Sequence, residues 1–107
     1  GAWRAYGAEF VGTGWMVAVG TGSVALGGSL LVISLSFGLA VTLAILALRG
    51  VSGAHINPAV STGFVLTGHL PRERWLGYVL AQVTGGLLGS GVVLAAAVVR
   101  WKDSAVP

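Results

Sequence analysis

The chain has 107 residues, of which 55% are hydrophobic and only 8% are charged. A soluble domain carries about 25% charged residues, so this composition excludes a disordered or coiled-coil protein and disfavours a soluble enzyme. Glycine supplies 18 residues, and membrane helices use glycine to bring their backbones close together. The composition therefore predicts a membrane protein with a few spans.

The net charge of +3 comes from six basic and three acidic residues that form no basic stripe. Such charges are typical of cations that flank membrane spans, so we expect no nucleic-acid partner. The chain has no cysteine, which excludes disulfides and thiol chemistry. Its two histidines and few carboxylates form no evident ligand set or acid–base pair. We therefore expect no metal, no cofactor and no enzymatic activity.

Charged residues mark the ends of three apolar stretches. Between Arg4 and Arg49 the only charge is Glu9, and this interval is too long for one span because about 20 residues cross the hydrocarbon core. The glycine- and serine-rich stretch at residues 20–29 predicts a turn within it. A further uncharged stretch follows residue 74. We therefore expect three spans, at about residues 6–26, 30–48 and 75–99.

The segment between the second and third spans, at about residues 50–68, is uncharged but broken. Asn57 is a favourable N-cap and Pro58 suits the first position of a helix, while Gly68 suits its C-terminal end. Such a helix would be roughly 15 Å long, about half of a bilayer core. The segment is therefore predicted to be re-entrant. Non-helical backbone at that depth must be buried in protein or line a water-filled cavity, which points to a pore or a binding site.

The N-terminus of a half-helix carries a partial positive charge and unpaired N–H groups. It favours anions and water oxygens and disfavours cations, and the amide of Asn57 supplies another donor. An ordinary capped interfacial helix would carry the same Asn-Pro pair. The pair alone therefore leaves both interpretations open.

The sequence from Ser52 to Val60, SGAHINPAV, resembles the first Asn-Pro-Ala loop of the aquaporin and glycerol-facilitator family. The motifs that resemble parts of the family's first, second and third spans are Ala8–Phe10, Ser34–Leu39 and Tyr78–Gln82. The resemblance implies an all-α membrane protein with three transmembrane helices and one re-entrant half-helix that carries Asn-Pro-Ala. Residues 1–107 would form one half of the family's inverted-repeat fold.

Family members usually carry two such repeats in one chain, whereas this sequence contains one. Val60 follows its Asn-Pro-Ala motif, at the place where the second repeat has a filter arginine. Half a pore would expose polar backbone to lipid, so we expect a partner. The partner is either a second copy in the inverted orientation, with a possible tetramer of such dimers, or a separate second-repeat chain. The four arginines before the third span and the two cations after it give only a weak orientation bias.

The resemblance implies a passive channel in the lipid bilayer, for water and small uncharged solutes such as glycerol, and we expect it in the plasma membrane. The alternative is a non-conducting half-channel subunit or fragment that needs a separate second-repeat partner. By resemblance, Asn57, Pro58 and Ala59 form the central constriction. Glu9 accepts hydrogen bonds from loop N–H groups, and Gln82 braces the third span.

The resemblance also implies a set of pore-lining positions. Phe37 lies 20 residues before Asn57, at the family's aromatic filter position, and Ile45 lies 12 residues before it, at another filter position. Packing in the core or against lipid is the alternative for both side chains. His55 is expected to face the passage below the constriction. The full set of lining residues is Phe37, Ile45, Ala54, His55 and Val60.

Overall fold

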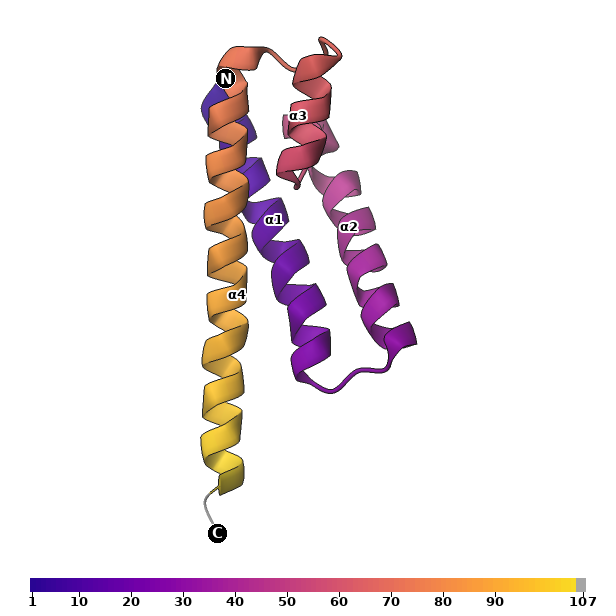
Figure 1. Ribbon diagram of the computed structural model, residues 1–107, viewed down its shortest axis with the longest axis vertical. Helices are drawn as coiled ribbons and strands as arrows, with labels where there is room; N and C mark the ends of the chain where they lie inside the picture. Colours follow the sequence, from indigo (N-terminus) through magenta and orange to yellow (C-terminus); the bar gives the residue numbers. More distant parts are fainter. Residues whose placement is uncertain (106–107) are drawn as a thin grey trace.

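The computed structural model describes residues 1–105, which form helices and loops without a strand. The elements in chain order are α1 (Ala2–Ala25), α2 (Leu30–Ser52), α3 (Pro58–Leu66), the 3₁₀ turn η1 (Arg72–Arg74) and α4 (Trp75–Ala105). The three long helices run alternately down and up the molecule, so the start of α1 and the end of α4 lie at opposite ends (Figure 1). The half-length α3 lies beside only the upper part of α4 (Figure 1). The all-α fold with three long helices and one half-length helix is therefore confirmed.

Helix α1 packs against both α2 and α4, and its crossing with α4 depends on glycine. A Cβ atom built on Gly85 would collide with the backbone oxygen of Phe10. One built on Gly89 would lie 2.5 Å from the backbone oxygen of Gly14. Because any side chain at these positions would push the helices apart, the two glycines allow close backbone contact.

The helix ends differ from those expected at several positions. Helix α1 begins four residues before the expected start, α2 continues to Ser52, and α4 continues to Ala105. The expected ends were placed at the charged residues, where the apolar sequence stops. Arginine and lysine are good helix formers, however, so a helix can continue through them. The non-helical backbone between α2 and α3 is consequently only residues 53–57.

Two stretches are long and apolar enough to cross a membrane, namely Leu30–Ser52 and Arg72–Ser104. Helix α1 is similar in length but carries Arg4, Glu9 and several glycines. Many large apolar side chains are exposed on the long helices, such as Leu30 at 82%. Glu9, Ser61 and Gln82 are the largest side chains that are fully buried. The molecule is therefore apolar on its surface and polar at one point inside.

Candidate functional site

The carboxylate of Glu9, on α1, is fully buried and accepts four hydrogen bonds. Its Oε2 accepts from the hydroxyl of Ser52 at 2.6 Å and from the backbone N–H of His55 at 3.1 Å. Its Oε1 accepts from the backbone N–H of Ile56 at 2.7 Å and from Nε2 of Gln82 at 2.8 Å. A buried carboxylate is tolerated when its oxygens are satisfied in this way. Glu9 therefore ties the loop at residues 53–57 to α1 and α4.

The backbone of this loop adopts an uncommon conformation that directs its N–H groups at Glu9. Gly53 has a φ of 86°, Ala54 of 51° and Ile56 of 48°. For residues other than glycine such angles are uncommon and store strain, so surrounding contacts must hold them. The hydroxyl of Ser52 accepts from the N–H of Ala54 at 3.1 Å, and the Tyr78 hydroxyl donates to the backbone oxygen of Ser52 at 2.7 Å. These two hydrogen bonds fix the N-terminal end of the loop, where it leaves α2.

Asn57 is the N-cap of α3. Its Oδ1 accepts from the N–H of Ala59 at 2.8 Å, and Pro58 occupies the first helical position. The amide nitrogen of Asn57 has no partner among the residues that the structure describes, and Asn57, Pro58, Ala59 and Val60 are all exposed. The free N-terminal end of α3 therefore presents donors beside the upper part of α4 (Figure 1).

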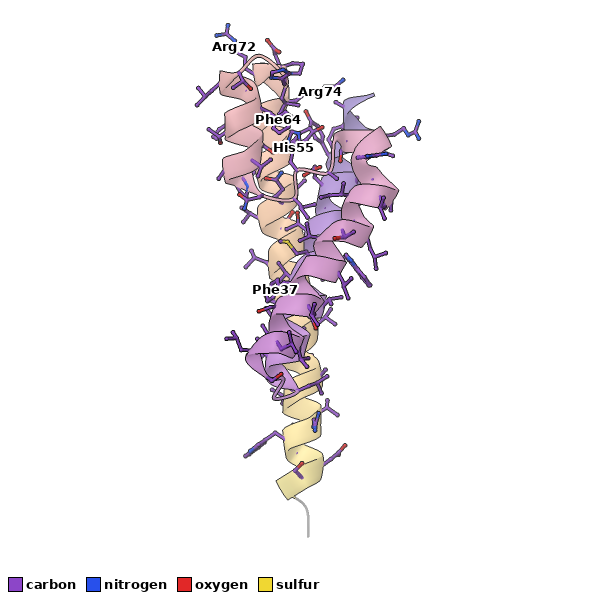
Figure 2. All side chains as sticks on the ribbon, turned by 90° about the vertical axis from the view of Figure 1, so that its right-hand side faces the viewer. Phe37, His55, Phe64, Arg72 and Arg74 are labelled. Atoms are coloured by element: carbon purple, nitrogen blue, oxygen red, sulfur yellow. The ribbon has the colours of Figure 1, made fainter. Side chains whose placement is uncertain are left out.

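His55 lies between two aromatic rings. Its side chain is only 7% exposed. The ring stacks on Phe64 with centroids 4.4 Å apart and lies 5.0 Å from the ring of Tyr78, and Figure 2 shows His55 and Phe64 next to each other. Its Nδ1 lies 2.8 Å from the hydroxyl oxygen of Ser61.

The two expected filter residues on α2 are not brought to the loop. The ring of Phe37 lies where a side chain on Gly20 would be, so it packs against α1. Figure 2 places Phe37 well below His55. Ile45 is 38% exposed. By contrast Ala54, which is buried, and Val60 both belong to the loop and first turn of α3.

An open groove of about 370 Å³ lies beside the N-terminus of α3, between α1 and α4. Its walls include Thr13, Met16, Asn57, Pro58 and Gln82. Thr13 Oγ1 and Gln82 Oε1 are buried and have no hydrogen-bond partner in the described part of the chain. Because unsatisfied buried polar groups are rare and costly, the groove is the incomplete part of the site.

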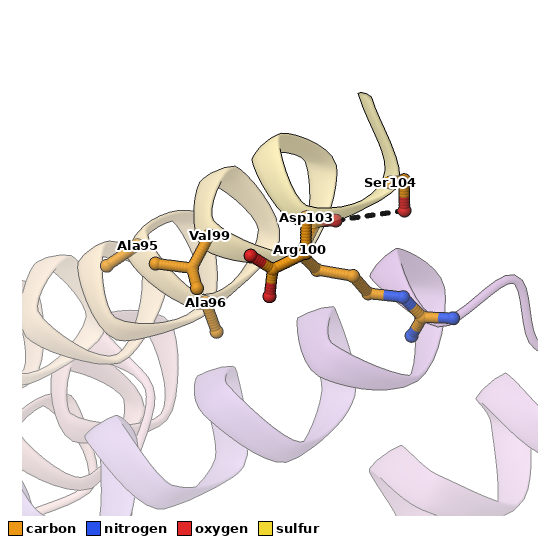
Figure 3. A pocket seen from close by; sticks show the side chains of 6 residues that line it. All are labelled: Ala95, Ala96, Val99, Arg100, Asp103 and Ser104. Atoms are coloured by element: carbon orange, nitrogen blue, oxygen red, sulfur yellow. Dashed lines mark hydrogen bonds between the residues drawn. The ribbon is translucent and has the colours of Figure 1, made fainter. Parts of the chain in front are cut away.

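A second hollow lies near the C-terminal end of α4 (Figure 3). Its lining residues are Ala95, Ala96, Val99, Arg100, Asp103 and Ser104, all on α4. It is a depression along a single helix, and its only hydrogen bond between lining residues joins the Ser104 hydroxyl to the Arg100 backbone oxygen at 3.0 Å. This hollow lies apart from the loop, and all of its lining residues come from one helix, so it is not a candidate site.

Ser52, Ser61 and Thr13 belong to the site but were not among the residues predicted from the sequence. Ser61 is the clearest omission, because it is fully buried and contacts both Gln82 and His55. The available signal was a serine in an otherwise apolar half-helix, four residues after the N-cap. Within residues 1–104, no group of three histidine, aspartate or glutamate side chains is placed to hold a metal ion.

A half-length helix that begins with Asn-Pro, preceded by a loop tied to a long helix by a buried carboxylate, is typical of a membrane protein with a re-entrant segment. Residues 1–105 match the family described as major intrinsic protein, and the chain belongs to this family. Its members are integral membrane channels and not enzymes.

Curated relatives share much of the chain. A glycerol uptake facilitator protein-like 6 of Lactiplantibacillus plantarum is 41% identical over 91 residues, or 84% of this chain and 42% of the relative. Aquaporin Z of Brucella melitensis is 40% identical over 93 residues, or 80% of this chain and 41% of the relative. A probable glycerol uptake facilitator protein of Thermotoga maritima is 33% identical over 111 aligned positions, which cover 95% of this chain and 47% of the relative. The chain thus spans less than half the length of these relatives.

Proposed function

We propose that this chain supplies half of a passive channel for water and small uncharged solutes such as glycerol, completed by a second copy in the inverted orientation. The observation that carries the proposal is the groove of about 370 Å³ onto which the N-terminus of α3 opens. Relatives named aquaporin and glycerol uptake facilitator support the solute class. We propose the plasma membrane as its location.

The loop offers both donors and acceptors to a passing solute. The α3 N-terminus carries partial positive charge, and the free amide of Asn57 adds a donor, so water oxygens are oriented and cations are repelled. The N–H groups of residues 54–56 point at Ser52 and Glu9. Because each peptide is planar and trans, the carbonyl oxygens of residues 53–55 point the opposite way, where they can accept hydrogen bonds. Asn57, Pro58 and Ala59 form the constriction, and Glu9 and Gln82 support it.

The mouths of the channel come from the remaining residues. Ala54, His55 and Val60 line the approach from the loop side, while Phe37 and Ile45 line it from α2. All but His55 are apolar, so the mouth lacks a cationic filter group. Such a mouth is wider and less selective than a strict water filter, since selectivity follows from pore width and lining donors.

An inverted second copy suits the groove because the exposed N-terminal end of α3 opens onto it. The amide of Asn57 lies at this groove and has no partner among the described residues. A two-fold interface brings the same patch of both subunits together, so the N-terminal ends of the two α3 helices would meet across the groove. Four such pairs would give a tetramer of dimers.

The alternative is a non-conducting half that requires a separate second-repeat chain. Val60 favours it, because the position after Asn-Pro-Ala carries no arginine.

Osmotic shrinkage of liposomes that contain only this chain tests the proposal, with stopped-flow detection at several temperatures. We expect fast shrinkage with a low activation energy. Asn57→Leu should reduce the rate to that of empty liposomes. Thr67→Leu, the same kind of change at the other end of α3, should retain it. Wild-type shrinkage at the empty-liposome rate would favour the alternative partner, and unchanged flux in Asn57→Leu would refute the pore assignment.

A substitution at Val60 tests the placement of the mouth. Val60→Arg should narrow it and reduce glycerol flux more than water flux, because glycerol is the larger solute. Val60→Met is the control that adds length without charge. Equal loss of both fluxes in Val60→Arg would contradict the placement.

Cysteine labelling tests the inverted pair directly, because the chain has no native cysteine. Glu73→Cys, in η1 just before α4, and Ser104→Cys, in the last turn of α4, place single thiols at exposed positions on opposite sides of the span. In intact cells, an impermeant maleimide should label about half of each variant if both orientations are inserted. Complete labelling of one variant and none of the other would exclude the inverted pair.

A further inference from the structure

Ser61 is fully buried within α3 and does not line the proposed channel. We infer that Ser61 is a positioning residue that fixes His55 in the neutral tautomer with its proton on Nε2. The ring then presents one N–H donor at the edge of the loop. The inference deepens the proposed function and rests on it only for the consequence for flux.

The direction of each hydrogen bond follows from Glu9. Both carboxylate oxygens serve as acceptors, so the Gln82 side chain must turn its Nε2 toward them. That nitrogen has two hydrogens, and it donates to Glu9 Oε1 at 2.8 Å and to Ser61 Oγ at 2.8 Å. Ser61 Oγ is therefore an acceptor toward Gln82.

The hydroxyl hydrogen of Ser61 then has one destination. Among the described residues, the partners of its oxygen are Gln82 Nε2 and His55 Nδ1, the latter at 2.8 Å. A fully buried hydroxyl that donated to nothing would lose free energy. Ser61 therefore donates to Nδ1. A ring nitrogen that accepts a hydrogen bond carries no proton, so the proton of neutral His55 resides on Nε2.

The surroundings of His55 hold the ring in this orientation. Phe64 covers one face of the ring, and Tyr78 of α4 approaches it at a tilt. Glu9 of α1 contacts His55 through the backbone N–H rather than through the ring. A Cβ atom built on Gly53 would lie 3.1 Å from Nε2, so the absence of a side chain there leaves that nitrogen clear.

Nitrogen-15 NMR of the histidine ring tests the inference without any need for flux. The full chain in lipid is labelled with ¹⁵N-histidine in a His69→Gln background, because His69 is exposed and is the only other histidine. We expect Nδ1 to show an unprotonated shift and Nε2 a protonated one. Ser61→Thr keeps a hydroxyl and should keep this pattern.

Ser61→Ala removes the donor to Nδ1, so the two tautomers should exchange and both shifts should move toward their average. A protonated Nδ1 in the starting protein would overturn the inference even if Ser61→Ala failed to fold. An unchanged spectrum in a folded Ser61→Ala variant would overturn it as well.

Liposome shrinkage separates this inference from the channel proposal. If the protein conducts water but His55 Nδ1 is protonated, the role of Ser61 is refuted and the channel proposal stands. If the proton is on Nε2 but this chain alone does not conduct, the inverted-pair channel is refuted and the role of Ser61 stands. If both hold, Ser61→Ala should conduct more slowly than Ser61→Thr, because its His55 presents the donor for only part of the time.

Discussion

The Glu9 network, formed by Glu9, Ser52, His55, Ser61 and Gln82, contrasts with the α2 face that carries Phe37 and Ile45. The network joins the four α-helices and a loop through buried side chains, with four hydrogen bonds on the carboxylate alone. The α2 face is apolar and touches the rest of the described chain mainly through α1. One region is held by directional bonds, and the other by contact with a single neighbour.

This difference shows which parts of the proposed channel one copy of the chain fixes by itself and which parts depend on a partner. The loop conformation and the position of the α3 N-terminus are fixed inside the chain, because loop N–H groups donate to Glu9 on α1 and Gln82 on α4 donates to Ser61 on α3. The lining of a mouth from α2 is not fixed in this way, since Ile45 is 38% exposed and apolar. A partner surface would complete the second region without altering the first.

The largest expected effect comes from Glu9→Gln. Each carboxylate oxygen accepts one backbone N–H, from His55 or Ile56, so the new NH₂ group must face one of them. Hydrogen bonds to a charged group contribute about 1.5–3 kcal/mol, and a buried donor left unpaired costs a further 1–3 kcal/mol or so. We expect a loss of about 3–5 kcal/mol, measured by unfolding in mixed micelles.

Glu73→Gln is the matched control, because Glu73 is 77% exposed and lies outside the network. It should leave the free energy of unfolding within about 0.5 kcal/mol of the starting value. If the two variants lost equal stability, the network would not be what holds the loop.

The next effect in size concerns the α1–α4 crossing that supports the network. Gly85→Ala places a methyl group against the backbone oxygen of Phe10, and a backbone atom cannot move aside without displacing a helix. We expect a loss of about 1–3 kcal/mol. Gly91→Ala has no atom within 4 Å of the new methyl group, so it should be neutral or stabilise by up to about 1 kcal/mol. Unfolding in mixed micelles measures both, and a stabilising Gly85→Ala would contradict the close crossing.

Much of the fold could be predicted from the sequence because its signals are local. The N-cap Asn57, the following Pro58 and the length of the apolar run define α3 without reference to any other element. The predicted ends of the long helices were less accurate, since α2 continues past Arg49 and ends at Ser52. A charge shows where a span leaves apolar surroundings, whereas a residue with a left-handed backbone, here Gly53, shows where the helix stops.

The contacts of the site depend on tertiary structure and were only partly accessible. The resemblance suggested Glu9 and Gln82 as polar supports, but the bond between them spans 73 positions in the sequence. Nothing local links Ser61 to Gln82, which lies 21 residues further on. The packing of Phe37 against Gly20 likewise depends on how α1 and α2 cross. The pore-lining roles of Phe37 and Ile45 stay predictions.

The smallest expected effect concerns the contact that holds the α2 face. Trp15 Nε1 on α1 donates to the backbone oxygen of Ala40 at 3.0 Å, and a carbonyl within a helix has a second lone pair free for this. Trp15→Phe keeps most of the ring but removes the donor, so it should cost about 0.5–1.5 kcal/mol. Trp3→Phe is the control, because Trp3 is 85% exposed. A Trp15→Phe effect as large as that of Glu9→Gln would show that α2 is held as firmly as the loop, and the contrast between the two regions would fail. A small effect on stability together with a clear change in glycerol flux would instead place α2, and with it Phe37, at the mouth of the channel.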